Sequence, residues 1–232
     1  MPVEPPGGRK TPFRYCIRRR LPGGGCGPWY HGGVQKPAEI DAAPRLSTVF
    51  LDRDGVINEK MPEGRYVTRW EEFHLLAGVA EAIAGLNRAG LRVIVVSNQR
   101  GVALGLYSAA DVDAIHARLQ ETLEPLGAHV DGFYYCPHDK GQCACRKPLG
   151  GLFEQAKAEA PAISAETSVM VGDSLSDIEF GRRLGMRTIF IEGDPQRRKP
   201  GGEAAAELAG TRAASLPEAV KLLLPGSNRT RP

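Results

Sequence analysis

The chain has no hydrophobic run long enough to cross a membrane. A spanning helix needs about 20 mostly apolar residues, whereas the longest apolar stretches, such as Leu91–Val96, have the length of a strand. The apolar core of about 7 to 15 residues that marks a secretory signal is also missing. We therefore expect a cytoplasmic protein that has no membrane partner.

An excess of charge of one sign is lacking as well. The 30 Lys and Arg residues barely exceed the 27 Asp and Glu residues, which is too small a difference to indicate nucleic-acid binding. The excess lies in residues 1–45, where eight basic residues face three acidic ones among eight glycines and eight prolines. Such a composition buries too little apolar surface to order a chain. We predict a disordered basic tail over residues 1–45, a folded domain over 46–225 and a frayed tail over 226–232.

Cysteines are few, and their number does not suit a disulfide framework. There are five, so they cannot all pair within one chain. Three of them fall between Cys136 and Cys145, a clustering that indicates a metal site in a reducing compartment. The other two, Cys16 and Cys26, lie in the predicted tail and are expected to be inert.

Between the tails, short apolar runs alternate with helical patterns. Buried strands are predicted at Thr48–Leu51, Leu91–Ser97, Phe133–Cys136, Ser168–Val171 and Met186–Ile191. Helices are predicted at 79–86, 108–123, 152–156, 178–184 and 217–224 from their apolar spacing. This alternation predicts a three-layer, Rossmann-like α/β fold in which helices cover both faces of a parallel sheet. In such folds ligands bind beyond the carboxyl ends of the strands.

Polar residues follow four of the predicted strands. In strand order these residues are Asp52 and Asp54, Ser97, Lys147, and Asp173 with Asp177. Acids and hydroxyls also cap helices, but capping does not account for all four strand ends together. Carboxylates hold Mg²⁺, one carboxylate can attack phosphorus to form an aspartyl-phosphate, and a second can transfer protons. The pattern therefore favours phosphoryl transfer.

The order of these residues resembles the four motifs of the haloacid dehalogenase superfamily of phosphatases, over residues 46–193. The resemblance implies Asp52 as nucleophile and Asp54 as general acid/base. It implies Ser97 and Lys147 as phosphate ligands. It also implies that Mg²⁺ is held by Asp52, the carbonyl group of Asp54 and Asp173, with Asp177 in support.

A closer resemblance is to the family of D-glycero-D-manno-heptose 1,7-bisphosphate 7-phosphatases and histidinol-phosphate phosphatases. It rests on the segments Phe50–Asn58, Ser97–Gly101, Cys136–His138 and Cys145–Pro148. It implies a Mg²⁺-dependent phosphomonoester hydrolase that acts through an aspartyl-phosphate. The implied substrate is the heptose bisphosphate of nucleotide-activated heptose biosynthesis, and the alternative is histidinol phosphate.

Two positions depart from the heptose enzymes. Ser174 follows Asp173, where the resemblance leads us to expect lysine. The loop between His138 and Cys143 is also short, closer in length to the histidinol-phosphate branch. Both departures concern the substrate and leave the type of reaction unchanged.

Three thiols and one imidazole lie within ten residues of one another, at Cys136, His138, Cys143 and Cys145. Zn²⁺ prefers four such ligands in a tetrahedron. From the spacing alone, buried thiols beside a surface histidine remain the alternative. The resemblance implies a structural zinc, which would pin this loop (the zinc loop, residues 136–145) and position Arg146 and Lys147.

The spacing leaves no room for a separate cap domain. Only 25 residues separate Asp54 from Val79, and one predicted helix occupies the segment from Ser97 to Gly132. We expect an open site shaped by the loops 58–74 and 99–107 and by the zinc loop. Substrate ligands are predicted at Asn98, Arg100 and Arg146, and the two arginines suit a second anionic group.

An open site also suits larger substrates, so a nucleic-acid 3′-phosphatase is a competing hypothesis. The slightly acidic core and the lack of an aromatic and basic stripe argue against it. A noncatalytic binding protein on this fold is another alternative, and the intact set of motif residues argues against that. We predict a monomeric enzyme that acts on a small sugar phosphate.

Overall fold

The computed structural model describes residues 45–197 and 200–224. The two predicted tails, residues 1–45 and 226–232, lie outside the described residues except for Arg45. In the part of the chain that is described, no helix is long and apolar enough to cross a membrane.

Within the described residues, six strands form one sheet in which every neighbouring pair is parallel. In chain order the strands are β1 (Thr48–Leu51), β2 (Arg92–Asn98), β3 (Gly132–Cys136), β4 (Ser168–Gly172), β5 (Arg187–Ile191) and β6 (Thr211–Ala213). The α-helices are α1 (Val79–Arg88), α2 (Arg100–Ala103), α3 (Ala109–Leu123), α4 (Gly151–Glu159), α5 (Leu175–Leu184), α6 (Gly202–Leu208) and α7 (Leu216–Leu223). The 3₁₀ turns are η1 (Trp70–Glu72), η2 (Glu124–Leu126), η3 (Ala165–Thr167) and η4 (Pro195–Arg197).

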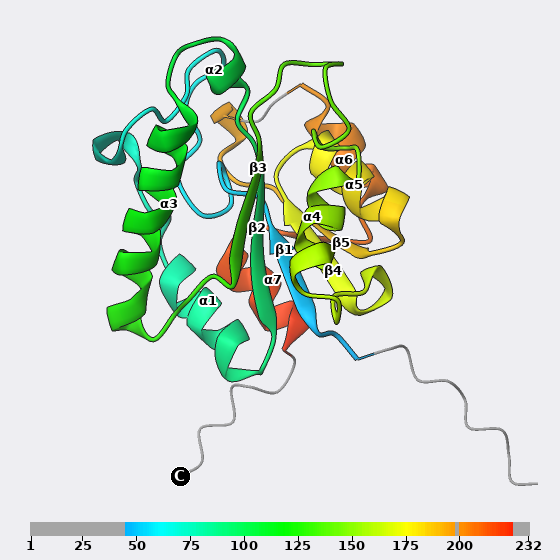
Figure 1. The fold of residues 1–232 in the computed structure, drawn as a ribbon. Coiled ribbons are helices and arrows are strands. Elements are labelled where there is room, and N and C mark those ends of the chain that lie inside the picture. Colours follow the sequence, from blue (N-terminus) through cyan, green and yellow to red (C-terminus); the bar gives the residue numbers. More distant parts are fainter. Residues whose placement is uncertain (1–44, 198–199, 225–232) are drawn as a thin grey trace, which may run out of the picture. The chain divides into compact units, whose positions relative to one another are not determined.

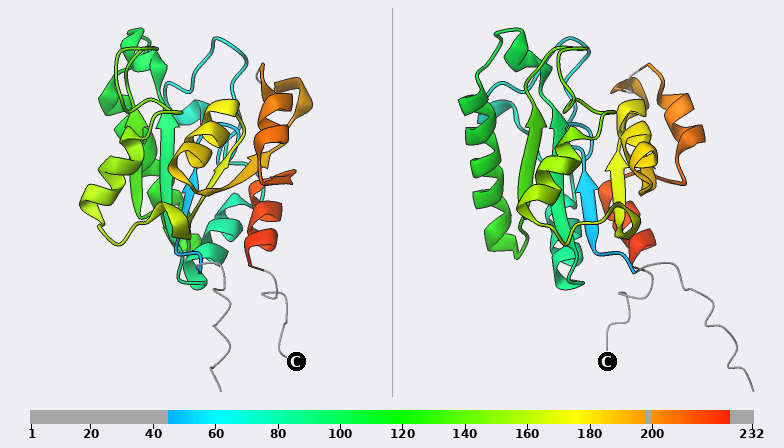
Figure 2. Two further views of the ribbon diagram at one scale, coloured as in Figure 1. Left: turned by 90° about the vertical axis from the view of Figure 1, so that its right-hand side faces the viewer. Right: turned by 45° about the vertical axis from the view of Figure 1, so that its right-hand side comes forward.

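Helices cover both faces of the sheet (Figures 1 and 2). Helices α1, α3 and α7 pack on one face, where their apolar side chains form one cluster with Val49 and Leu51. Helices α4 and α5 pack on the other face against Phe50, and α6 lies against α5. Successive residues of β1 thus point to opposite, buried faces, which explains its unbroken apolar sequence. The predicted three-layer α/β fold is confirmed.

The five predicted strands are present, but the sequence did not reveal every element. The missed elements are α2, α6 and β6. Helix α2 is a single turn, and β6 has three residues of which two are exposed, so neither carries a periodic apolar signal. The prediction of one helix between Ser97 and Gly132 was therefore wrong, because α2 and η2 accompany α3. The start of α3 is held by a capping box of Ser108 and Asp111.

The sheet order β3-β2-β1-β4-β5-β6 places the functional edge at its centre. The chain leaves β1 on one side toward β2 and later returns to its other side at β4. Leu51, the last residue of β1, pairs with both Val95 and Val171, so β4 ends one residue and β2 three residues beyond the end of β1. A reversal of strand order opens a crevice at the carboxyl ends of the strands. The described residues of the loops that flank this crevice hold no additional domain over it.

Candidate active site

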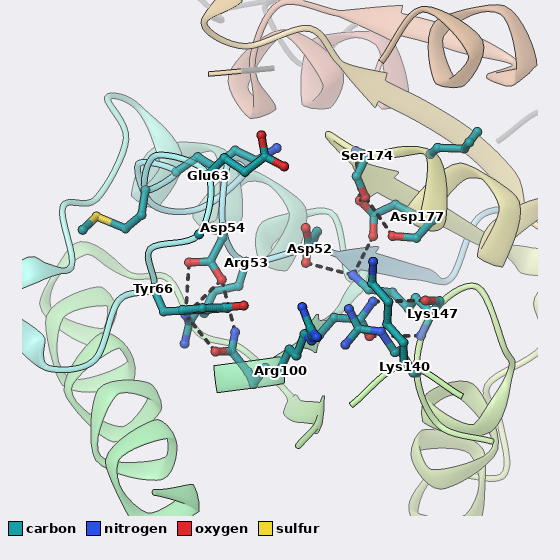
Figure 3. A pocket seen from close by; sticks show the side chains of 18 of the residues that line it. Asp52, Arg53, Asp54, Glu63, Tyr66, Arg100, Lys140, Lys147, Ser174 and Asp177 are labelled. Atoms are coloured by element: carbon teal, nitrogen blue, oxygen red, sulfur yellow. Dashed lines mark hydrogen bonds and ion pairs between the residues drawn. The ribbon is translucent and has the colours of Figure 1, made fainter. Parts of the chain in front are cut away.

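Three carboxylates meet at the centre of this edge, and Figure 3 shows two of them, those of Asp52 and Asp177. Asp52 follows β1, Asp173 follows β4, and Asp177 lies in the first turn of α5. One oxygen atom of each lies within 4.8 Å of the others, and all three residues are buried. Such a set of oxygen atoms has the chemistry of a Mg²⁺ site. The sequence prediction that acids of two strand ends meet here is confirmed.

Two glycines allow the carboxylates to come this close. Gly55 has a φ of 98°, and a Cβ atom there would lie 2.2 Å from Asp173 Oδ2. A Cβ atom on Gly172 would lie 2.2 Å from the Cβ atom of Asp177. A side chain at either position would force the acids apart, so the two glycines belong to the site.

Lys147 neutralises part of this cluster. Its Nζ atom lies 2.8 Å from Asp52 Oδ1 and 2.6 Å from Asp177 Oδ1, and it donates to the Val96 carbonyl oxygen at 2.7 Å. Burial lowers the pKa of Lys147, but the charges of Asp177 and Asp52 outweigh it and the net shift is upward. Lys147 therefore stays charged and orients both carboxylates.

The protonation of Asp52 depends on its neighbours. Burial raises the pKa of Asp52, the charges of Asp177 and Asp173 raise it further, and Lys147 lowers it, with a result of about 6. An added positive charge would favour the ionised form. The carboxylate cluster thus favours the binding of a cation.

A second ammonium group reaches the cluster from an unexpected place. Lys60, in the loop between β1 and η1, is buried and forms an ion pair with Asp173 Oδ2. Ser174, where lysine was expected, instead donates to Asp177 Oδ2 through its backbone nitrogen and its hydroxyl, and so caps α5. Lys60 thus places a second positive charge beside the carboxylate cluster. The sequence analysis missed this residue because nothing local links it to a site 113 residues away.

Asp54 is separated from the other acids and held by three donors. Arg53 Nη2 donates to both of its carboxylate oxygens at 3.0 and 2.9 Å. Asn58 Nδ2 donates to Oδ1 at 3.0 Å, and Gln99 Nε2 donates to Oδ2 at 3.1 Å. Burial raises the pKa of Asp54, but the charge of Arg53 and these hydrogen bonds together bring it below its usual value. Asp54 is thus an ionised, firmly oriented carboxylate.

The last residues of β2 and Gln99, which follows them, connect the parts of the site. Ser97 is buried and accepts a hydrogen bond from Gln99 Nε2. The side chain of Asn98 exchanges two hydrogen bonds with the backbone of Lys147, at 3.0 and 3.1 Å. Asn98 therefore holds Lys147, and its contact with substrate stays a prediction. Gln99 was not identified from the sequence.

A pocket of about 1040 Å³ opens in front of Asp52 and Lys147. Several cationic side chains line it, among them those of Arg100, Lys140 and Arg146. Figure 3 shows Arg100 and Lys140 on the same side of the pocket, near Lys147. The three predicted loops contribute to the lining, and so does a segment that the sequence analysis missed, with Arg197.

Arg100 and Arg146 differ in their hydrogen-bond partners. Arg100 forms a two-pronged ion pair with Asp139 of the zinc loop, at 2.5 Å from Nε to Oδ1 and 3.3 Å from Nη2 to Oδ2. The Nη1 atom of Arg146 is buried and has no hydrogen-bond partner among the described residues. A buried donor of this kind costs free energy until an acceptor arrives. Arg146 is therefore suited to an anionic ligand.

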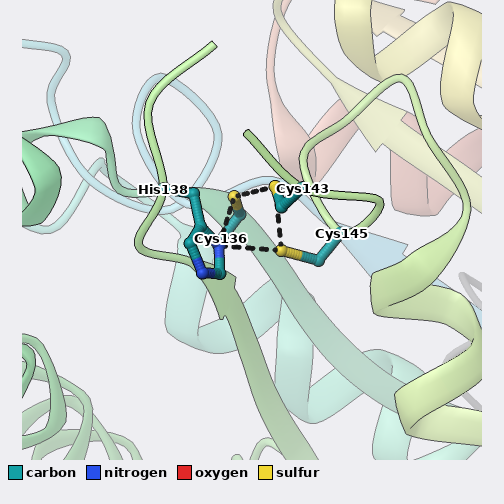
Figure 4. Close-up of side chains that lie close together, drawn as sticks. All are labelled: Cys136, His138, Cys143 and Cys145. Atoms are coloured by element: carbon teal, nitrogen blue, oxygen red, sulfur yellow. Dashed lines mark hydrogen bonds between the residues drawn. The ribbon is translucent and has the colours of Figure 1, made fainter. Parts of the chain in front are cut away.

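The three thiols and the imidazole of the zinc loop converge on one point (Figure 4). The distances are 3.4 Å from Cys136 Sγ to Cys143 Sγ, 3.3 Å from Cys143 Sγ to Cys145 Sγ, and 3.3 Å from Cys145 Sγ to His138 Nδ1. Tetrahedral zinc with bonds of about 2.3 Å needs ligand atoms about 3.8 Å apart, close to these values. The cluster therefore fits the predicted donor set of a zinc site.

Burial raises the pKa values of the Cys136 and Cys145 thiols, so of the three thiols only Cys143 has a lowered pKa in the metal-free loop. Burial raises the pKa of Cys143, but hydrogen bonds from Cys145 Sγ, from the backbone of Arg146 and from Cys136 Sγ bring it to about 7. A thiolate, the form that binds metal, is thus accessible near neutral pH. All three cysteines are free, with no disulfide among them.

Comparisons with known proteins agree with this geometry. Residues 144–218 match the HAD-hydrolase-like family. The chain is 44% identical over 137 residues to the D-glycero-alpha-D-manno-heptose-1,7-bisphosphate 7-phosphatase of Mycobacterium tuberculosis. This match covers 59% of this chain and 72% of that protein. It is 37% identical over 161 residues to the D-glycero-beta-D-manno-heptose-1,7-bisphosphate 7-phosphatase of Rhodopseudomonas palustris. That match covers 66% of this chain and 87% of the relative.

Solved structures give the same result. The D,D-heptose 1,7-bisphosphate phosphatase of B. bronchiseptica, complexed with magnesium and phosphate, has a TM-score of 0.67 and 29% identity, and covers 77% of this chain and 98% of that one. The enzyme of the same name from Burkholderia thailandensis has a TM-score of 0.54 and 28% identity, over 77% and 99%. The chain is a haloacid dehalogenase-like phosphatase, and it belongs to the D-glycero-D-manno-heptose-1,7-bisphosphate 7-phosphatase family.

Proposed function

We propose that this phosphatase hydrolyses the 7-phosphate of D-glycero-D-manno-heptose 1,7-bisphosphate. The observation that carries the proposal is the composition of one pocket. Asp52 lines it, and Arg100, Lys140 and Arg146 line the same cavity. A substrate with two phosphate groups suits both features, because one group meets Asp52 while the other meets cations.

Asp52 is the nucleophile in this proposal. One of its carboxylate oxygens forms a bond to phosphorus while the bond between phosphorus and the C7 oxygen breaks, giving an aspartyl-phosphate and the sugar alcohol. A water molecule then forms a bond to phosphorus, and the bond to Asp52 breaks to release inorganic phosphate. Lys147, in contact with Asp52, orients its carboxylate for attack and balances its charge.

Asp54 transfers the protons. It gives a proton to the departing C7 oxygen and takes one from the attacking water. Its three donors, Arg53, Asn58 and Gln99, fix its direction. The charge of a bound phosphate raises the pKa of a nearby carboxyl group, which favours the protonated form needed in the first step.

The carboxylate cluster fits Mg²⁺. We assign Asp52, the carbonyl group of Asp54 and Asp173 to hold the ion, with Asp177 in support through Lys147. When bound, Mg²⁺ offsets the repulsion between the Asp52 carboxylate and the phosphate. The related B. bronchiseptica structure contains magnesium and phosphate, which supports the assignment.

The cations of the pocket select the substrate. Arg146 and Arg100 bind the 1-phosphate, since guanidinium groups form strong two-pronged hydrogen bonds with phosphate. Histidinol phosphate, the alternative substrate, carries a cationic amine, which these arginines repel. We further propose that Zn²⁺ bound by the zinc loop holds Arg146 and Lys147 in place. Residues 46–225 are the catalytic domain, acting as a monomer.

A phosphate-release assay tests the proposal. Both anomers of the heptose bisphosphate, histidinol phosphate and a heptose or hexose monophosphate are compared at saturating Mg²⁺. We expect the highest kcat/KM with the bisphosphate. Arg146→Ala should lower that value about 10- to 100-fold, the loss expected for a hydrogen bond between charged groups, and should barely affect the monophosphate.

The exposed Arg183, on the surface of α5, provides the matched control. Arg183→Ala should change neither activity. If histidinol phosphate is hydrolysed as well as the bisphosphate and Arg146→Ala does not alter the preference, the substrate assignment is wrong. The same assay with single-stranded DNA bearing a 3′-phosphate tests the nucleic-acid alternative.

A further inference from the structure

The side chain of Gln99 joins two groups of the proposed reaction and is almost fully buried. Its Nε2 atom donates to Asp54 Oδ2 at 3.1 Å and to Ser97 Oγ. Its Oε1 atom accepts from the Tyr107 hydroxyl at 2.7 Å and from Arg53 Nη2 at 3.4 Å. Both amide hydrogens and both oxygen lone pairs are thus used.

The neighbours of Gln99 permit only one orientation of its amide group. Arg53 can only donate hydrogen bonds, so it must face the amide oxygen. With the amide oxygen turned to Arg53, the amide nitrogen faces Asp54 Oδ2 at 3.1 Å and donates to it. With the amide fixed in this way, Tyr107 must donate to it and Ser97 must accept from it.

The position of Tyr107 depends on Gly101. A Cβ atom on residue 101 would lie 2.1 Å from a ring carbon of Tyr107, so only glycine leaves room for the ring beside Gln99. Tyr107 is buried, which raises the pKa of its hydroxyl to about 12. It therefore keeps its proton and can donate at any pH at which the protein is active.

The hydrogen bond that Gln99 donates to Ser97 determines which way the hydrogen of the Ser97 hydroxyl can point. Its oxygen already accepts a hydrogen, and among the described residues it has no further hydrogen-bond partner. Its own hydrogen is therefore available as a donor. Ser97 is the last residue but one of β2, and Asp52 directly follows the neighbouring strand β1. Because Val95 pairs with Leu51, Ser97 lies close to the level of Asp52, and a phosphoryl group on Asp52 is the acceptor that we assign to it.

We propose that Gln99, fixed by Tyr107, is a positioning residue that commits the Ser97 hydroxyl to donate to the phosphoryl group and holds Asp54 with the same amide. If the amide were reversed, its oxygen would face Ser97 and accept the Ser97 hydrogen, so the bond from Ser97 to phosphate would be lost. The inference rests on the proposed role of Ser97 as a phosphate ligand.

The test is a double-mutant cycle read out by inorganic phosphate as a competitive inhibitor in the presence of Mg²⁺. Ser97→Ala should raise the inhibition constant about tenfold in the wild-type background, the cost of one hydrogen bond to a charged group. In the background of Gln99→Met, which keeps the size of the side chain without its hydrogen bonds, Ser97→Ala should add less than about twofold. Tyr107→Phe, a milder change, should reduce the effect of Ser97→Ala in the same direction and serves if Gln99→Met does not fold.

The matched control is Tyr135→Phe, since the Tyr135 hydroxyl contacts Asp113 and the Ala109 carbonyl oxygen instead of the site. In the Tyr135→Phe background, Ser97→Ala should raise the inhibition constant of phosphate as much as it does in the wild type. An equal effect of Ser97→Ala in all backgrounds would overturn the role of Gln99 while leaving Ser97 as a phosphate ligand. No effect of Ser97→Ala in the wild type would show that the proposed role of Ser97 is itself wrong, and the inference would fall with it.

Discussion

Lys60→Met removes one partner of a buried ion pair, and its consequences can be worked out from the structure. The side chains of Lys60 and Asp173 are only 8% and 9% exposed. Breaking such a pair leaves an uncompensated buried charge and costs about 3–5 kcal/mol. In a domain of this size each kcal/mol lowers the melting temperature by about 2–4 °C. We therefore expect a decrease of roughly 6–20 °C when metal is removed by a chelator.

Mg²⁺ should reduce the difference in melting temperature between Lys60→Met and the wild type. In the proposed site the ion binds Asp173 and supplies the positive charge that the variant lacks, so the stabilisation by Mg²⁺ should be larger in the variant than in the wild type. Differential scanning calorimetry with chelator and with saturating Mg²⁺ measures both quantities. Lys221→Met, at an exposed position on α7, is the control and should melt like the wild type. A decrease below about 2 °C, or one that Mg²⁺ leaves unchanged, would refute the reasoning.

Four further predictions address the carboxylates and the zinc loop. Asp52→Asn should abolish phosphate release, and a loss of kcat below about tenfold would exclude Asp52 as the nucleophile; Asp54→Asn should lower kcat about 10²- to 10⁴-fold. Because burial and nearby carboxylates raise the pKa of Asp52 to about 6, its contribution to the stability of the metal-free protein is lost as pH rises through 6. The Mg²⁺-induced rise in melting temperature should therefore be larger at about pH 7.5 than at about pH 5, and the reverse order would contradict this assignment. Cys143→Ser should lower both the zinc content, measured by elemental analysis, and the melting temperature; unchanged values of both would argue against a zinc site.

The central part of the site could be predicted because the sheet topology determines it. Parallel strands bring their carboxyl ends to one edge, so Asp52 and Asp173 had to lie near each other once their strands were recognised. The four ligands of the zinc loop lie close together in the sequence, and one loop suffices to bring them together. In both cases a local pattern and a general rule of topology were enough.

The residues that support the site could not be predicted in the same way. Lys60 meets Asp173 across 113 residues, and Arg100 meets Asp139 across 39. These contacts depend on loop conformations, which no apolar periodicity determines. Gln99 has an ordinary neutral side chain, and only the donors and acceptors packed around it reveal its role. Helix α6 and strand β6 were missed for a related reason, since they are short and their chain segment has few buried residues.

The balance of charge at the sheet edge connects these contacts to the reaction. Three carboxylates, those of Asp52, Asp173 and Asp177, face two ammonium groups, those of Lys147 and Lys60. The cluster therefore retains one negative charge, which repels a phosphate dianion but attracts a divalent cation. Bound Mg²⁺ would reverse the sign of the net charge, so the site would attract the phosphate that Asp52 attacks in the proposed reaction. It follows that a change that removes either lysine should favour the metal and disfavour the phosphate, whereas a change that removes Asp177 should do the opposite.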